Sequence, residues 1–180
     1  MRIILIIFSS LLISGCHQPE ARRPVSQQSG SFIKISAERN KKLNADEIAK
    51  IEAMIAKDSM QEYLASENGF RYYYDIKNET DSIRPKFGDL VYYRYDVSDL
   101  SGNIIYAEEE LGYQTYAIDQ QELFSGLREG LKLMKAGETV TFVFPSQIAY
   151  GYYGDENRIG TNIPIKCTVS LDSINKNSSN

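Results

Sequence analysis

The pattern of apolar and polar residues divides the chain into a helical part and a longer part built of strands. After the Asn44-Ala45-Asp46-Glu47 stretch, apolar side chains recur at helical spacing, at Ile48, Ile51, Met54 and Ile55. An N-cap followed by this spacing predicts a helix over residues 45–66, ended by Gly69. Its apolar stripe needs cover, either from the neighbouring domain or from a second copy of the same helix.

From residue 70 onward the spacing changes to the alternation typical of strands. Alternation predicts strands over residues 70–76, 91–97, 113–118, 138–144 and 166–174. The second of these places Val91, Tyr93, Tyr95 and Val97 on one face. One helical island interrupts the strands, with its apolar stripe at Leu123, Phe124, Leu127, Leu131 and Met134 and with Gly137 at its end. The expected fold class is therefore α+β, an antiparallel β-sheet wrapped against one short α-helix and preceded by an N-terminal helical extension.

The first sixteen residues have a different character. An apolar run from Ile3 to Ile13 is too short for a permanent bilayer-crossing helix and fits a cleavable signal peptide. It ends in Leu12-Ile13-Ser14-Gly15-Cys16, which resembles a bacterial lipobox. Residues 1–15 are predicted to be a lipoprotein signal peptide, and Cys16 the lipidated residue that anchors the protein to a membrane, in the outer membrane facing the periplasm. An ordinary secretory signal with a chance cysteine, or a short membrane stub, remains as the alternative.

The prediction assigns the remaining segments by composition. Residues 16–43 contain Pro19, Pro24 and a Ser-Gln-Gln-Ser-Gly stretch with little aliphatic periodicity, so they are interpreted as the lipid anchor and a flexible tether. Residues 44–69 form the helical extension, residues 70–176 the main domain and residues 177–180 a disordered tail.

Charge and composition exclude several classes of function. The formal net charge is −4 and the basic residues are scattered, which argues against a nucleic-acid partner. His17 is the only histidine, so a histidine-dependent triad is excluded and no metal site or cofactor is expected. Three consecutive carboxylates at 108–110 are interpreted as solvated residues of an extended segment.

Three ordered blocks carry a resemblance to a known family. Residues 122–134 with Ala136-Gly137-Glu138, the segment Pro145–Gly151, and Asn162-Ile163-Pro164 resemble FKBP-type peptidyl-prolyl cis/trans isomerase domains over roughly residues 83–175. Together with the lipidation signal and the helical extension, they also resemble the gliding-motility-associated FKBP-type lipoproteins of gliding bacteria. The resemblance implies proline-containing polypeptide substrates, no cofactor, and a role in folding exported or membrane-associated proteins, with a link to gliding motility.

The resemblance also implies the site residues. Catalytic roles fall on Tyr150, Phe124 and Tyr95, where the Tyr150 hydroxyl and the backbone amide near Phe124 would hold a substrate carbonyl. Substrate-binding roles fall on Tyr106, Leu123, Leu127, Ile163 and Leu171.

Three positions depart from the family pattern. Ala107 stands where an aspartate is expected, Leu127 replaces the usual tryptophan floor and Leu171 replaces a phenylalanine. The alternative is therefore a non-catalytic FKBP-like binding module in a membrane-associated assembly. Aromatic residues at alternating strand positions are also ordinary core residues when taken alone. The helix over residues 45–66 is a candidate for homodimer formation.

Overall fold

Eight strands form one antiparallel sheet in the computed structural model, which describes residues 29–177. The strands are β1 (Leu64–Ala65), β2 (Arg71–Ile76), β3 (Leu90–Tyr95), β4 (Val97–Ser98), β5 (Ile104–Tyr106), β6 (Gln114–Ala117), β7 (Glu138–Phe144) and β8 (Ile165–Asn175). The helices are α2 (Ser29–Lys57), α3 (Glu108–Leu111), α4 (Ser125–Leu133) and the 3₁₀ turn η1 (Ser146–Ile148). The predicted α+β class, with an antiparallel sheet, one short helix against it and an N-terminal helix, is confirmed.

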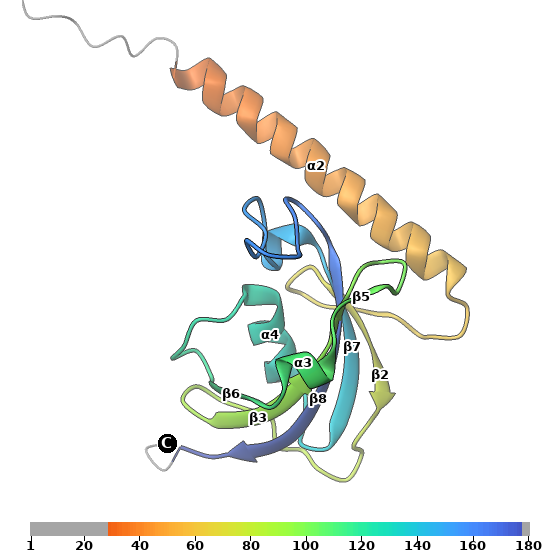
Figure 1. Cartoon of the computed structure of the whole chain (residues 1–180), viewed down its shortest axis with the longest axis vertical. Coiled ribbons are helices and arrows are strands. Elements are labelled where there is room, and N and C mark those ends of the chain that lie inside the picture. The colour runs from red at the N-terminus through yellow and green to blue at the C-terminus, as the bar shows by residue number, and fades with distance from the viewer. Residues whose placement is uncertain (1–28, 178–180) are drawn as a thin grey trace, which may run out of the picture. The chain divides into compact units, whose positions relative to one another are not determined.

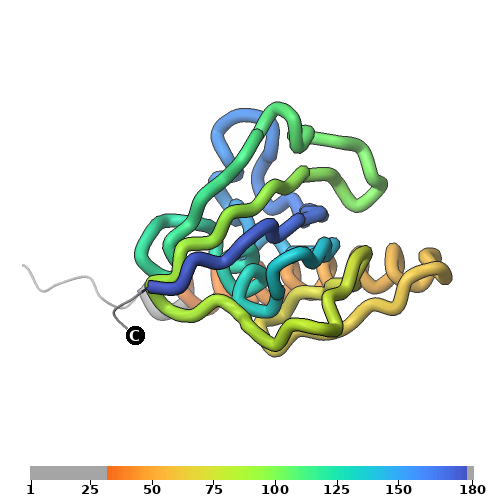
Figure 2. The backbone as a smooth tube through the Cα atoms, turned by 90° about the horizontal axis from the view of Figure 1, so that it is seen from below, coloured from red at the N-terminus to blue at the C-terminus, as the bar shows by residue number. Residues whose placement is uncertain are grey.

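The strand order is β1-β2-β7-β8-β3-β6, and β4 pairs with both β5 and the start of β8. At the centre, β7 and β8 pair without a register shift from Glu138 opposite Leu171 to Phe144 opposite Ile165. Figure 2 shows β3 and β8 running side by side, in yellow-green and dark blue, and a bulge shifts their register between Tyr92 and Tyr93. Such bulges increase the local twist and help the sheet to curve.

Helix α4 lies against the sheet (Figure 1), and its apolar residues belong to the same core. Its buried stripe includes Leu127 and Leu131, both fully buried. Gly126 is required at the contact because a Cβ there would lie 2.6 Å from the Phe144 ring and 2.8 Å from the Ile148 carbonyl oxygen. On β3 and β4, Val91, Tyr93, Tyr95 and Val97 are all buried, as their alternation predicted.

The N-terminal helix begins earlier and ends earlier than the sequence pattern indicated. The prediction of a helix over 45–66 is wrong at both ends, and the flexible tether predicted over 16–43 is wrong from Ser29 onward, because α2 spans Ser29–Lys57. The segment 29–44 contains no proline and is rich in helix-forming Lys, Glu and Arg. It lacks an apolar stripe, and that stripe was the signal on which the prediction depended.

The chain divides within α2 into two compact units, residues 1–38 and residues 39–180. In the second unit, the Glu47 side chain is 3% exposed and accepts hydrogen bonds from the Ser146 N–H (2.9 Å) and hydroxyl (2.7 Å). Asn44 donates to the Gln147 side chain (2.8 Å), and Ile51 is buried. Residues 44–47 therefore lie inside α2 and do not cap it, and Glu47 attaches α2 to η1.

The predicted boundary between extension and domain at residues 69 and 70 is also wrong. Leu64 and Ala65 form β1, which pairs with Tyr72 and Arg71 of β2, so that boundary falls inside a hairpin. Gly69 has a φ of +87° and belongs to the hairpin turn, not to the end of a helix. At the other end, the N–H of Asn177 donates to Asp89 (2.9 Å), while residues 178–180 of the predicted tail lie outside the described residues.

Residues 108–110 are helical, which corrects the extended segment predicted there. Glu108 and Glu110 belong to α3. Arg94 binds Glu108 at 2.8 Å, and Arg158 binds Glu110 at 2.6 Å. Two arginines from other elements thus hold the acidic turn in place.

Between residues 29 and 177, no helix is both long and apolar enough to cross a membrane. The predicted signal peptide and Cys16 lie outside the described residues.

Candidate active site

An open cleft of about 560 Å³ lies at the N-terminal end of α4. Its lining consists of Gln121, Glu122, Leu123, Phe124, Arg128 and Tyr150. Leu123 and Phe124 precede α4, instead of opening it as the sequence suggested, and Phe124 is the N-cap residue with an extended backbone. The cleft thus brings together three of the predicted site residues, Leu123, Phe124 and Tyr150.

Phe124 and Tyr150 form the aromatic wall of this cleft. Their ring centroids are 5.1 Å apart with an interplanar angle of 43°, and Phe124 also meets Phe144 edge-on at 5.5 Å. Among the described residues, no protein group bonds the Phe124 N–H or the Tyr150 hydroxyl. Two polar groups beside the aromatic wall are therefore free to bind a carbonyl oxygen of a ligand.

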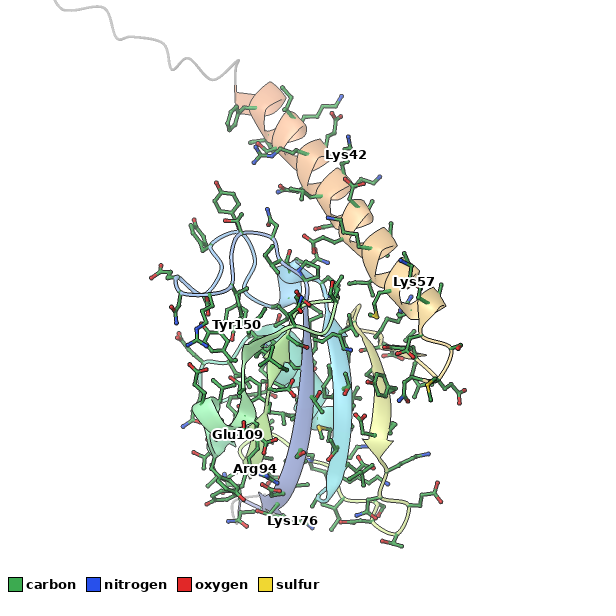
Figure 3. All side chains as sticks on the ribbon, turned by 45° about the vertical axis from the view of Figure 1, so that its right-hand side comes forward. Lys42, Lys57, Arg94, Glu109, Tyr150 and Lys176 are labelled. Carbon is green, nitrogen blue, oxygen red and sulfur yellow. The ribbon has the colours of Figure 1, made fainter. Side chains whose placement is uncertain are left out.

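Figure 3 shows Tyr150 at the end of the sheet where the loop 149–163 begins, with Arg94 and Lys176 toward the other end. Burial raises the pKa of the Tyr150 hydroxyl well above its usual value, with smaller contributions from Tyr95, Asp155 and Tyr106. Burial likewise raises the pKa of Tyr95, helped by Cys167 and Tyr106. Tyr106 and Tyr150 pack against the core that contains Tyr95. We call these three residues the tyrosine cluster, and their hydroxyls stay protonated at neutral pH.

A carboxylate reaches the tyrosine cluster even though Ala107 stands at the position where the sequence comparison expected one. The Tyr106 hydroxyl donates a hydrogen bond to Asp155, which raises the pKa of Tyr106. Asp155 also accepts the N–H groups of Ile159 (2.7 Å) and Asn157 (3.0 Å). Burial alone would raise the pKa of Asp155, but these hydrogen bonds, led by that of Tyr106, outweigh it and lower the pKa.

From the sequence, no role was assigned to residues 152–161, and so Asp155 was not identified. The Asp155–Arg158 charged run was the available signal, but no spacing rule relates it to Tyr106, from which Asp155 is 49 residues distant.

Arg158 attaches the same loop to the rest of the domain. Its guanidinium carbon lies 4.8 Å from the centroid of the Tyr106 ring, and its Nη1 donates to the Ile105 carbonyl at 2.9 Å. Its guanidinium also forms a bidentate ion pair with the Glu110 carboxylate, at 2.8 and 2.6 Å. Asp155 and Arg158 together hold the loop over the Tyr106 side of the site.

The remaining predicted site residues differ in their exposure. Leu127 and Leu171 are 0% and 1% exposed and belong to the closed core, as does Tyr95 at 9%. Ile163 is 38% exposed at the end of the loop. Substrate contacts of Leu127 and Leu171 stay predictions, and any such contact requires the buried side chains to become accessible.

The cleft offers binding groups without an evident nucleophile. Cys167 is fully buried, and burial raises the pKa of its thiol well above the usual value, as expected of an inert core cysteine. Within residues 29–177, no three His, Cys, Asp or Glu side chains are grouped to hold a metal ion. An aromatic wall, a free N–H and a free hydroxyl are suited to binding and orienting an amide.

Comparisons with known proteins agree with this geometry. The FKBP-type peptidyl-prolyl cis-trans isomerase family matches residues 81–172, about half of the chain. The probable FKBP-type peptidyl-prolyl cis-trans isomerase FkpA of Neisseria meningitidis is 28% identical over 99 residues, which are 54% of this chain and 36% of that protein. The chain therefore matches only about a third of that relative's length.

Two crystal structures share the fold. A peptidyl-prolyl cis-trans isomerase from Pseudomonas syringae aligns with a TM-score of 0.61 and 20% identity, covering 76% of this chain and 96% of that one. FkpA from Escherichia coli aligns with a TM-score of 0.60 and 20% identity, covering 97% of this chain and 81% of that one. With the family match over the cleft, the tyrosine cluster and the central strands, the chain belongs to the FKBP-type peptidyl-prolyl cis-trans isomerase family.

Proposed function

We propose that this protein catalyses cis/trans isomerisation of X-Pro bonds in polypeptides. The main observation in support is that two polar groups at the aromatic wall of the cleft, the Phe124 N–H and the Tyr150 hydroxyl, have no hydrogen-bond partner within residues 29–177. Uncatalysed X-Pro isomerisation takes tens to hundreds of seconds, because twisting the amide costs about 18–20 kcal/mol of lost resonance.

The proposed mechanism needs no covalent step. Contact with the apolar surfaces of Leu123, Phe124 and the Tyr150 ring disfavours the charge-separated planar amide relative to the twisted amide, so this side of the cleft stabilises the transition state more than the ground state. The Phe124 ring packs on the proline, while its N–H and the Tyr150 hydroxyl hold the flanking carbonyl groups. Fixing the flanking chain lets rotation occur about one bond only.

A proline-peptide isomerisation assay on the full-length protein tests the activity. We expect faster equilibration of the cis and trans forms than in buffer, in proportion to the protein concentration. A folded protein that gives only the uncatalysed rate would refute the proposal.

We further propose that the substrates are exported or membrane-associated proteins, reached from a lipid anchor on Cys16 in the outer membrane facing the periplasm. The lipobox-like residues before Cys16 support this placement. The Cys16→Ser variant should leave the membrane fraction, and its retention there would contradict lipid anchoring. A link to gliding motility rests on the sequence resemblance alone and is tested by the motility of a deletion strain.

A second candidate function is a non-catalytic FKBP-like binding module in a membrane-associated assembly. It is favoured by Ala107 and by Leu127, which is fully buried where the family usually places a tryptophan floor. This function predicts capture of a specific partner that survives loss of the Tyr150 and Phe124 side chains, together with no acceleration of isomerisation.

Homodimer formation through residues 45–66 is also proposed, with a smaller surface than the sequence implied. Ile51 is buried within the second unit, whereas Ile48 stays 46% exposed. Sedimentation of the full-length Cys16→Ser protein should give a dimer, and Ile48→Glu should give a monomer. If the wild-type protein is a monomer at high concentration, the proposed dimer is refuted.

A further inference from the structure

A second groove, of about 640 Å³, lies directly beyond the loop that carries Tyr150. One wall is the first part of α2 in the second unit, with Arg39, Asn40 and Asn44. The facing wall is the loop, with Tyr152 and Tyr153, and Gln147 of η1 lies between the two walls. We call this surface the tyrosine groove.

The groove is built as a fixed surface. Glu47 holds Ser146 through two hydrogen bonds, and the side chain of Asn44 donates to that of Gln147 at 2.8 Å, so α2 and η1 are joined along the floor. At the opposite wall, the Asn162 N–H donates to the Gly151 carbonyl at 2.9 Å and closes the base of the loop. A preformed groove loses less conformational entropy when a ligand binds.

The chemistry of the walls matches an extended polypeptide. Asn40, Asn44 and Gln147 carry carboxamides, which both donate and accept hydrogen bonds and so pair with backbone N–H and C=O groups. Tyr152 and Tyr153 are 65% and 82% exposed, and their rings touch each other edge-on at 5.4 Å. Exposed tyrosines offer large apolar contact area together with a hydroxyl and lose little side-chain entropy on binding.

The tyrosine groove and the isomerase cleft are lined by consecutive residues of one loop. Tyr150 lines the cleft, and the next residue, Gly151, already lines the groove together with Tyr152. A polypeptide that extends from Tyr150 along this loop would meet the groove at the next residues. We propose that the tyrosine groove binds the segment of unfolded substrate polypeptide that flanks the isomerised proline, an inference that rests on the proposed isomerase function.

The consequence is a preference for long, unfolded substrates over short peptides. A blocked tetrapeptide centred on X-Pro fills only the cleft, whereas a longer chain also contacts Tyr152 and Tyr153. Contacts made equally in the ground and transition states lower KM without changing kcat. The groove should therefore act through KM on long substrates only.

The test compares two substrates on the full-length protein, a blocked X-Pro tetrapeptide and an unfolded protein whose refolding is limited by proline isomerisation. The double variant Tyr152→Ser with Tyr153→Ser should raise KM for the protein substrate at least about fivefold, the scale of losing one important contact residue. Its kcat/KM on the tetrapeptide should match that of wild type, which also reports an intact fold. The matched control is Tyr113→Ser, since Tyr113 is a similarly exposed tyrosine, 73%, that does not line the groove.

A binding measurement without turnover keeps the inference separate from the isomerase proposal. A reduced, alkylated, proline-containing polypeptide is titrated with wild type and with the double variant. Weaker binding by the variant supports the groove even if the tetrapeptide assay shows no catalysis. Equal affinity of the two proteins overturns the inference, as does a variant whose only change is its oligomeric state, which would make the groove a contact between copies of this chain.

Discussion

At the scale of single residues, Tyr150 is the side chain on which the proposed chemistry depends most. Its hydroxyl has no hydrogen-bond partner within residues 29–177, while its ring packs on Phe124 at 5.1 Å. Tyr150→Phe therefore removes a ligand contact and leaves the packing in place. We expect kcat/KM to fall about two- to twelvefold, the equivalent of a neutral hydrogen bond of roughly 0.5–1.5 kcal/mol.

The stability of the Tyr150→Phe variant serves as the control. The denaturant midpoint of this variant should equal that of wild type, because no hydrogen bond within the described protein is lost. A variant that isomerises as fast as wild type would instead place the carbonyl contact on another group.

The tyrosine cluster also predicts how activity depends on pH. The pKa values of Tyr150, Tyr95 and Tyr106 are raised and that of Asp155 is lowered, so none of these groups titrates near neutrality. We expect kcat/KM to stay level between about pH 5 and pH 9, given ordinary values near 3.9 for Asp and 10 for Tyr.

The acid side of the profile tests Asp155. A carboxyl whose pKa is lowered by folding contributes stability that is present above its unfolded pKa and lost as pH falls through the folded value. The loop should therefore detach below about pH 4, with falling kcat/KM. Asp155→Asn should lack that decline and show a lower, level activity. A wild-type profile with a step near pH 6 or 7 would contradict this account.

At the scale of elements, the sequence predicted what packs regularly and missed what is held by single polar contacts. Strands β2, β3, β6, β7 and β8 and helix α4 were found because alternation and helical spacing reflect burial on one face, as at Val91 and Leu131. The short strands β1 and β5 were not predicted. The segment 29–44 of α2 and the short helix α3 lack such a face. Helix α3 is held by ion pairs with Arg94 and Arg158, which are distant from it in sequence. No local sequence pattern indicates those ion pairs.

The same limit applies to the site. Leu123, Phe124 and Tyr150 were located through motif resemblance, and the cleft does bring them together. Asp155 was not located in this way. Its hydrogen bond with Tyr106 depends on the path of an irregular loop, which local sequence patterns do not indicate.

The contact between α4 and β7 gives a prediction at this scale. In Gly126→Ala the new Cβ would meet the Phe144 ring at 2.6 Å and the backbone carbonyl of Ile148 at 2.8 Å. Overpacking of this kind costs about 1–3 kcal/mol, against a gain of about 1 kcal/mol in helix propensity. We expect a net loss of stability, measured by chemical denaturation, together with lower activity because Ile148 precedes Tyr150 closely.

The control is Gly130→Ala, in the interior of the same helix, where the full propensity gain applies. The atoms nearest to its Cβ would belong to the Phe142 side chain, at 3.1 Å, and not to the backbone. Gly130→Ala should therefore be the more stable of the two variants, and the reverse order would show that α4 can shift away from β7.

At the scale of the whole molecule, the end of α2 is an integral part of the isomerase unit. The unit begins at Arg39, although the family match begins at residue 81. Glu47 and Ile51 are buried, and Glu52 pairs with Arg71 of β2 at 2.6 Å. A chain shortened to residues 39–180 should therefore retain the stability and tetrapeptide activity of the full protein, whereas a chain shortened to 58–180 should lose part of both.

Two point variants separate the contact from the length of the chain. Glu47→Ala leaves the N–H and hydroxyl of Ser146 buried without an acceptor, a cost of about 1–3 kcal/mol for each unsatisfied group. Glu47→Gln keeps one acceptor oxygen and should be destabilised less. Because Ser146 begins the turn that leads to Tyr150, Glu47→Ala should also lower kcat/KM on the tetrapeptide, with denaturation and isomerisation measured on the same samples. If residues 58–180 fold and isomerise as well as residues 39–180, then α2 is only an attachment to the domain and Glu47 has no part in positioning its active site.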